Sequence, residues 1–133
     1  MKKTIVFIVA VSLGLNGCSR EITSKFQVSG WNLGDPVHKN VQFVINGDSV
    51  GPVVKFGQSS GVYEVEIVVG QSSYYNSGTT PTNDVQSTNV ALGVQDVDTH
   101  IIFMVVQGCY LTKYQVTNFI YERKGGLDNL YCR

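Results

Sequence analysis

After the first 25 residues, apolar and polar side chains alternate along most of the chain. The clearest stretch is residues 62–69, where Tyr, Val and Ile alternate with Glu64 and Glu66. A period of two predicts a strand with one buried face and one solvated face, and it places both glutamates on the solvated face. Runs rich in Val, Ile, Thr, Tyr and Phe predict six further strands, at residues 26–31, 41–45, 50–56, 85–94, 99–107 and 110–121, and a short edge at 130–132.

Local signals indicate how some of these strands are arranged. Asn46 and Gly47 predict a tight hairpin turn, and Pro52 predicts that the returning strand lies at a sheet edge. The unbroken apolar run of residues 101–106 predicts a central strand buried on both faces. We therefore expect an all-β protein, an antiparallel β-sandwich of about seven strands of the immunoglobulin-like or transthyretin-like kind.

The first 18 residues follow a different pattern. Lys2 and Lys3 precede an apolar run, residues 5–15, which is shorter than the ~20 residues that a spanning helix needs. A positive start, a short apolar core and a small residue before the break are typical of a secretory signal peptide.

The run ends in Leu15-Asn16-Gly17-Cys18, which resembles the lipobox of bacterial lipoproteins. Leu15, Gly17 and Cys18 match that motif, whereas Asn16 stands where the family has a small or β-branched residue. The resemblance implies that residues 1–17 are removed and that Cys18 becomes the N-terminus, carrying a diacylglycerol thioether and an acylated amine such as a palmitoyl amide. Two or three acyl chains suffice for stable membrane attachment.

The resemblance also implies a cellular location and a domain organisation. Ser19 follows the cysteine where the family places Asp for inner-membrane retention, so we expect anchoring in the outer membrane with the domain facing the periplasm. Residues 18–25 would be the lipidated tether, and residues 26–133 a single β-sandwich domain. The membrane is thus one expected partner, through the lipid.

The charge of the chain argues against one class of partner. The chain has 10 Lys and Arg residues and 10 Asp and Glu residues; loss of Lys2 and Lys3 leaves 8 against 10, a net charge of about −2. Nucleic-acid binding needs a basic patch, and the nearest candidate, residues 122–124, is a mixed cluster. We expect no nucleic-acid partner.

Two cysteines remain once Cys18 is lipidated. In an exported chain the pair Cys109 and Cys132 predicts a disulfide, with two free thiols as the alternative. The disulfide would close a loop of about 24 residues and stabilise the fold by roughly 3–4 kcal/mol in the chain-entropy model.

One motif suggests a nucleophile. Residues 57–61 match G-x-S-x-G around Ser59, and Asp96, Asp98 and His100 follow in the order that hydrolases use. The residues after the motif predict a strand, however, and a nucleophile elbow needs a helix there. We interpret residues 57–61 as a turn rich in Gly and Ser, and we expect no catalytic residues and no cofactor.

A second pattern is compatible with a metal. If residues 96–100 are extended, Asp96, Asp98 and His100 point to one side and could ligate a divalent ion. The alternative, which we favour, is a turn shaped by the aspartates.

Aromatic residues provide the candidates for binding. Tyr74, Tyr75 and Asn76 lie in a polar stretch, residues 70–84, and exposed tyrosines among Ser, Gly and Asn are typical of adaptable binding surfaces. Trp31 is a second aromatic candidate, and its alternative is a place in the core or at a sheet rim.

Together these observations predict a non-catalytic accessory module in the cell envelope that holds a protein partner, as a component of an envelope or secretion assembly. A surface-exposed ligand-binding or receptor-blocking lipoprotein is the alternative. A small envelope hydrolase or metal-dependent enzyme is the third hypothesis.

Replacing Cys18 by Ser tests the anchor. Because the acyl chains would supply the membrane attachment, we expect the variant to move from the membrane fraction to the soluble fraction, measured by fractionation and immunoblotting. A Cys18→Ser protein that stays with the membranes would contradict the lipobox interpretation.

Overall fold

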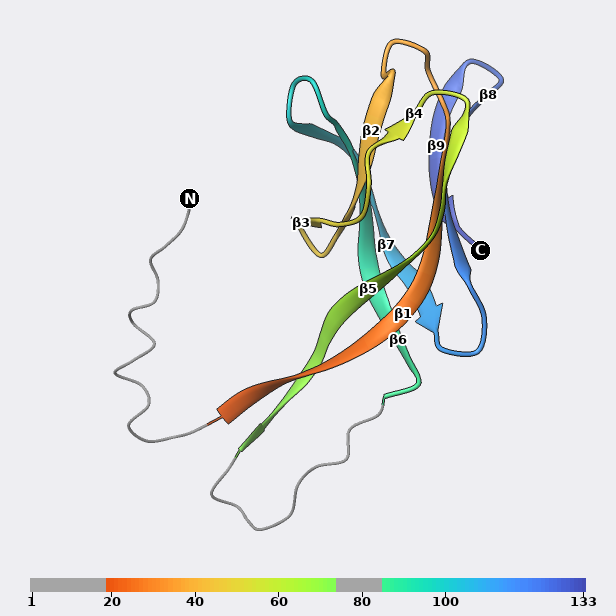
Figure 1. Ribbon diagram of the computed structural model, residues 1–133. Coiled ribbons are helices and arrows are strands. Elements are labelled where there is room, and N and C mark those ends of the chain that lie inside the picture. The colour runs from red at the N-terminus through yellow and green to blue at the C-terminus, as the bar shows by residue number, and fades with distance from the viewer. Residues whose placement is uncertain (1–18, 74–84) are drawn as a thin grey trace. The chain divides into compact units, whose positions relative to one another are not determined.

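The computed structural model describes residues 19–73 and 85–133, and in these ranges it contains nine strands and no helix (Figure 1). Cys18, Tyr74, Tyr75 and Asn76 lie outside the described residues. Within them, no helix is long and apolar enough to cross a membrane. The strands are β1 (Ser19–Leu33), β2 (Asn40–Ile45), β3 (Asp48–Ser49), β4 (Val54–Lys55), β5 (Gln58–Ser73), β6 (Ser87–Asp96), β7 (Ile101–Thr112), β8 (Thr117–Lys124) and β9 (Leu127–Cys132).

The chain divides into two compact units. Residues 25–67 and 85–133 form the larger one, and the other includes residues 19–24 of β1 and 68–73 of β5. The larger unit contains two packed sheets, so the predicted all-β sandwich is confirmed.

The number of strands and one of the pairings differ from the prediction. One sheet has the order β5-β1-β8-β9, and the other β3-β2-β6-β7 with β4 also paired to β2. The pair β1–β8 is parallel, so the first sheet is mixed instead of purely antiparallel. Seven strands have at least six residues. Of the predicted strand at 50–56 only β4 is observed, and the other short strand, β3, precedes it.

Several local predictions can be compared directly with the structure. Asn46 and Gly47 form the hairpin turn after β2, both with positive φ (52° and 89°), as the type I′ geometry requires. The predicted strand at 110–121 is wrong, because a turn at residues 113–115 separates β7 from β8.

The prediction of a central strand at residues 99–107 is also wrong. β7 pairs only with β6 among the described strands and forms the edge of its sheet. Several of its apolar side chains are exposed, including Ile101 (58%) and Val105 (55%).

The core lies between the inner faces of the two sheets. Its largest fully buried side chains are aromatic, and the Phe43 ring of β2 lies 5.8 Å from the Phe119 ring of β8. Gly30 of β1 makes this packing possible, because a Cβ there would stand 2.7 Å from the Phe43 ring. A side chain at position 30 would therefore force the two sheets apart.

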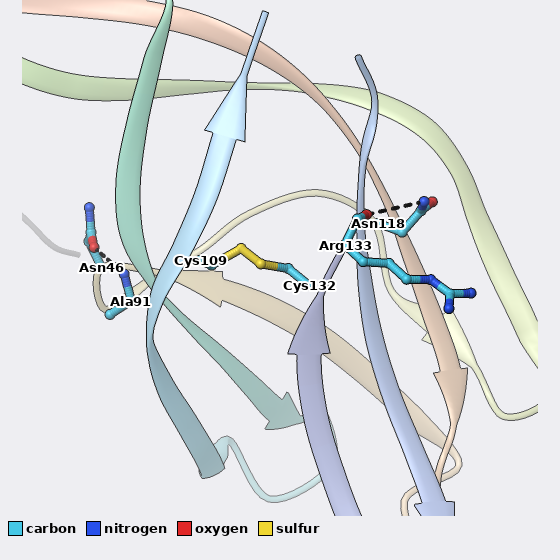
Figure 2. Close-up of a disulfide and its surroundings, with 6 residues drawn as sticks. All are labelled: Asn46, Ala91, Cys109, Asn118, Cys132 and Arg133. Carbon is cyan, nitrogen blue, oxygen red and sulfur yellow. Dashed lines mark hydrogen bonds between the residues drawn. A yellow bond between two sulfur atoms is a disulfide. The ribbon is translucent and has the colours of Figure 1, made fainter. Parts of the chain in front are cut away.

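Each open side of the sandwich is closed by a contact between edge strands. Figure 2 shows the disulfide between Cys109 of β7 and Cys132 of β9, which joins the two sheets on one side as the sequence predicted. On the other side, the ring of Tyr63 in β5 occupies the space beside Gly51, in the connection between β3 and β4. Tyr63 is largely buried, which raises its pKa to about 12.

This second closure predicts a steric effect at Gly51. Gly51→Ala adds a Cβ against the Tyr63 ring at a residue whose φ is +76°, so we expect strain from both sources and a loss of about 2–4 kcal/mol in the free energy of unfolding. Urea denaturation followed by circular dichroism measures it.

Gly47→Ala is the matched control. Its φ is +89° but nothing lies within 4 Å of the added Cβ, so the expected loss is only ~1 kcal/mol. Equal losses in the two variants would show that Tyr63 does not close this side.

Candidate functional site

The residues considered as metal ligands form a turn, which is the interpretation that the sequence favoured. Residues 97–100 connect β6 to β7, and Asp96 Oδ1 accepts hydrogen bonds from the backbone N–H groups of Asp98 (2.9 Å) and Thr99 (3.1 Å). Asp98 and His100 are exposed, and His100 has a positive φ of 62°. In residues 19–73 and 85–133, no three His, Cys, Asp or Glu side chains gather as a metal site requires.

The G-x-S-x-G motif at residues 57–61 also has a structural role. Residues 56 and 57 form the turn, and Ser59 and Ser60 already belong to β5. Ser59 Oγ accepts a hydrogen bond from Gly61 N (3.0 Å), while Ser60 Oγ accepts one from Gly30 N in β1 (2.8 Å). The Ser60 contact joins β5 to β1, whereas the Ser59 contact is local to β5, and no described hydrogen bond joins Ser59 to Asp98 or His100.

A pair that the sequence analysis missed lies at the end of the sandwich. His38, in the connection between β1 and β2, has its Nδ1 atom 2.7 Å from Asp96 Oδ2. The hydrogen bond to His38 is the main reason that the pKa of Asp96 is lowered, so Asp96 is a carboxylate and can only accept. The proton of the hydrogen bond is therefore on Nδ1 of His38.

Two aromatic rings fix the imidazole. Phe103 of β7 stacks on His38 with centroids 4.0 Å apart and an interplanar angle of 9°, and Tyr121 of β8 meets it edge-on at 6.2 Å. Segments from three parts of the chain thus hold one histidine in a single orientation.

Tyr121 also holds the segment that carries His38. Its ring occupies the space beside Gly34, and its hydroxyl accepts a hydrogen bond from Asp35 N (3.1 Å) and donates to Asp128 Oδ2 (3.3 Å). Burial raises the pKa of Tyr121 to about 12, so the hydroxyl stays protonated. Arg123 forms ion pairs with the carboxylates of both Asp35 (2.9 Å) and Asp128 (3.1 Å).

The pair faces a hollow of about 370 Å³, whose lining combines apolar and acidic groups: Val37, His38, Asp96, Asp98, Thr99, Ile101 and Phe103. An imidazole held by a carboxylate is the arrangement that orients a general base in hydrolases. No described hydroxyl or thiol hydrogen bonds to Nε2 of His38, so the nucleophile of such a triad is not in place among these residues.

Trp31 lies on a different surface. It is 37% exposed on the outer face of β1, and its Nε1–H donates to Oδ1 of Asn118 in β8 (3.4 Å). A groove of about 230 Å³ surrounds it, lined by Trp31, Leu33, Asn118, Ile120, Glu122, Tyr131 and Arg133. The structure thus places Trp31 at the surface and not in the core.

Comparison with known proteins adds no relative. No protein-family model matches the chain, and no curated protein and no solved structure matches it either.

The His38–Asp96 pair predicts a pH dependence of stability. A pKa lowered by folding means that the contribution of Asp96 is complete above the unfolded pKa of about 3.9 and is lost as the pH falls through the folded value. Asp96→Asn should therefore lower stability by about 1–3 kcal/mol at pH 7 and flatten the loss of stability that occurs as the pH falls below the unfolded pKa of about 3.9. Chemical denaturation at a series of pH values measures both effects.

Asp98→Asn is the control, because the Asp98 side chain is exposed and only its backbone N–H contacts Asp96. If the two variants follow the same pH profile, the pair with His38 is not the source of the dependence.

Proposed function

We propose that this protein is a lipid-anchored, non-catalytic module of the bacterial cell envelope, which holds a protein partner at the periplasmic face of the outer membrane. The lipobox-like residues 15–18 support the anchor, and Ser19 after Cys18 supports the outer membrane. The disulfide between Cys109 and Cys132 fits an oxidising compartment outside the cytoplasm.

The edge of β7, which pairs with β6 alone among the described strands, carries the proposal of a protein partner. The strand has 12 residues, Ile101–Thr112, and none of them is charged. Natural edge strands are usually protected by lysines, prolines or short length, because an unprotected edge pairs with other chains. The exposed side chains of Ile101, Ile102 and Val105 add apolar contact area beside the backbone groups.

The other edge of the same sheet offers less. β3 and β4 have two residues each, with Pro52 between them, so this edge presents little regular backbone to a partner. We therefore propose that strand addition occurs at β7 and not at the edge near Pro52. An added strand would gain affinity from main-chain hydrogen bonds and specificity from alternate side chains.

The shape of β7 limits what can bind. Its pairing with β6 shifts register between Val90 and Leu92 and between Val94 and Gln95, and such irregularities bend a strand. A short partner strand fits such an edge better than a long one.

Val105→Lys tests the edge. Lysine at an exposed edge position opposes pairing with an apolar strand, because its charge would lose water, so we expect loss of the partner in a pull-down from solubilised membranes. The measurement is recovery of one specific protein by the wild-type chain and its absence with the variant.

Val62→Lys is the matched control, since Val62 is 59% exposed in β5, the edge strand of the other sheet. It should retain the partner. Equal recovery with both variants, or loss with both, would contradict the role of β7.

A further inference from the structure

The outer face of β1, β8 and β9 carries an ordered band of side chains. The register pairs Trp31 of β1 with Ile120 of β8, and Ile120 with Tyr131 of β9. These three residues therefore form one row across three adjacent strands, which lie ~4.8 Å apart. Ile120 is only 6% exposed although it is on the outer face, because the two aromatic residues flank it.

Each of the two aromatic side chains has a polar neighbour on β8. Trp31 Nε1–H donates to Asn118 Oδ1, and the phenol of Tyr131 lies near the carboxylate of Glu122. Burial and the nearby charge of Glu122 raise the pKa of Tyr131. The row forms an apolar platform, and the hydrogen bond that holds Trp31 lowers the entropy lost when a ligand binds.

Polar rows lie on both sides of this platform. On one side, two residues before Ile120 in β8, Asn118 exchanges two backbone hydrogen bonds with Arg133 (2.8 and 3.0 Å). Figure 2 shows both residues beside the disulfide. On the other side, two residues after Ile120, Glu122 of β8 pairs with Asn129 of β9. Each row is ~6.5–7 Å from the central one. The platform therefore has a guanidinium and an amide on one side and a carboxylate and an amide on the other.

We infer that this face binds a neutral glycan. The C–H face of a sugar ring packs on an aromatic side chain, while the hydroxyl groups at its rim need both donors and acceptors. Arg133 supplies donors on one side and Glu122 supplies acceptors on the other, while the Asn118 amide bonds to Trp31 and to the carbonyl of Arg133. A charged ligand would be attracted by one row and repelled by the other, whereas a hydroxyl group can satisfy either.

The small volume of the groove indicates that it contacts only a short segment of the glycan. At about 230 Å³ it lies below the ~300–1,000 Å³ that is usual for pockets of drug-sized ligands. The inference goes beyond the proposed protein partner, because it concerns the face of one sheet while the partner strand would pair with the edge of the other. Failure of either proposal therefore leaves the other standing.

Trp31 provides the test, because it is the single tryptophan of the chain. The full chain, solubilised in a detergent without a sugar headgroup, is titrated with cellotetraose, with maltotetraose and with the tetramer of N-acetylglucosamine, up to about 10 mM. We expect a saturable change in Trp31 emission with at least one of the three. Calorimetry with Trp31→Ala should then show no binding of that glycan.

Further variants identify the platform and its rims. Tyr131→Ala and Arg133→Ala should weaken binding about tenfold or more, whereas Tyr114→Ala, at a 78% exposed tyrosine in the turn after β7, should leave it unchanged. Circular dichroism establishes that each variant is folded, and Arg133→Ala serves if Tyr131→Ala does not fold.

Three results would overturn the inference. The first is no response to any of the three glycans over this range. The second is binding that survives both Trp31→Ala and Arg133→Ala. The third is an emission change caused by an uncharged apolar tetrapeptide, with none caused by the glycans, since that would assign the face to a peptide.

Discussion

The disulfide between Cys109 and Cys132 is the constraint on which the rest of the arrangement depends. It joins β7 and β9, which are edge strands of opposite sheets and share no ladder of hydrogen bonds. β9 is a strand of only six residues with one neighbour, β8, so the covalent link fixes its position in the sandwich. The same link fixes the end of β7. Both surfaces assigned to binding are therefore built on strands that this bond holds.

The sequence contained enough information for the fold class. Alternation along residues 62–69 and the turn at Asn46 depend on neighbours in the chain, and both are confirmed. The prediction of a central strand from residues 101–106 was wrong, because an apolar stretch can have the same composition in a buried central strand and in an exposed edge strand. Only the neighbours of β7 distinguish the two, and these are set by pairing over long sequence distances.

The sites were less predictable than the fold, for the same reason. His38 and Asp96 are 58 residues apart, and the only pattern that includes Asp96 relates it to Asp98 and His100, so nothing local signals its pairing with His38. Trp31 was a candidate from the sequence, but its partners Ile120 and Asn118 come from β8, through a parallel pairing that no turn signal predicts. Residues 96–100 show the opposite case, since a suggestive spacing became a turn once Asp96 bound its own backbone neighbours.

The two proposed surfaces share a chemical property that follows from the low charge of the chain. Charged residues make up 15% of the sequence, none of them lies in β7, and Glu122 and Arg133 oppose each other across the aromatic platform. Neither surface therefore has a net field to steer a charged partner over distance. Recognition at both depends on backbone pairing, apolar contact and short hydrogen bonds, which salt screens far less than it screens exposed ion pairs. Specificity must accordingly come from geometry. The disulfide and the contact between Tyr63 and Gly51 fix this geometry at the two sides of the sandwich.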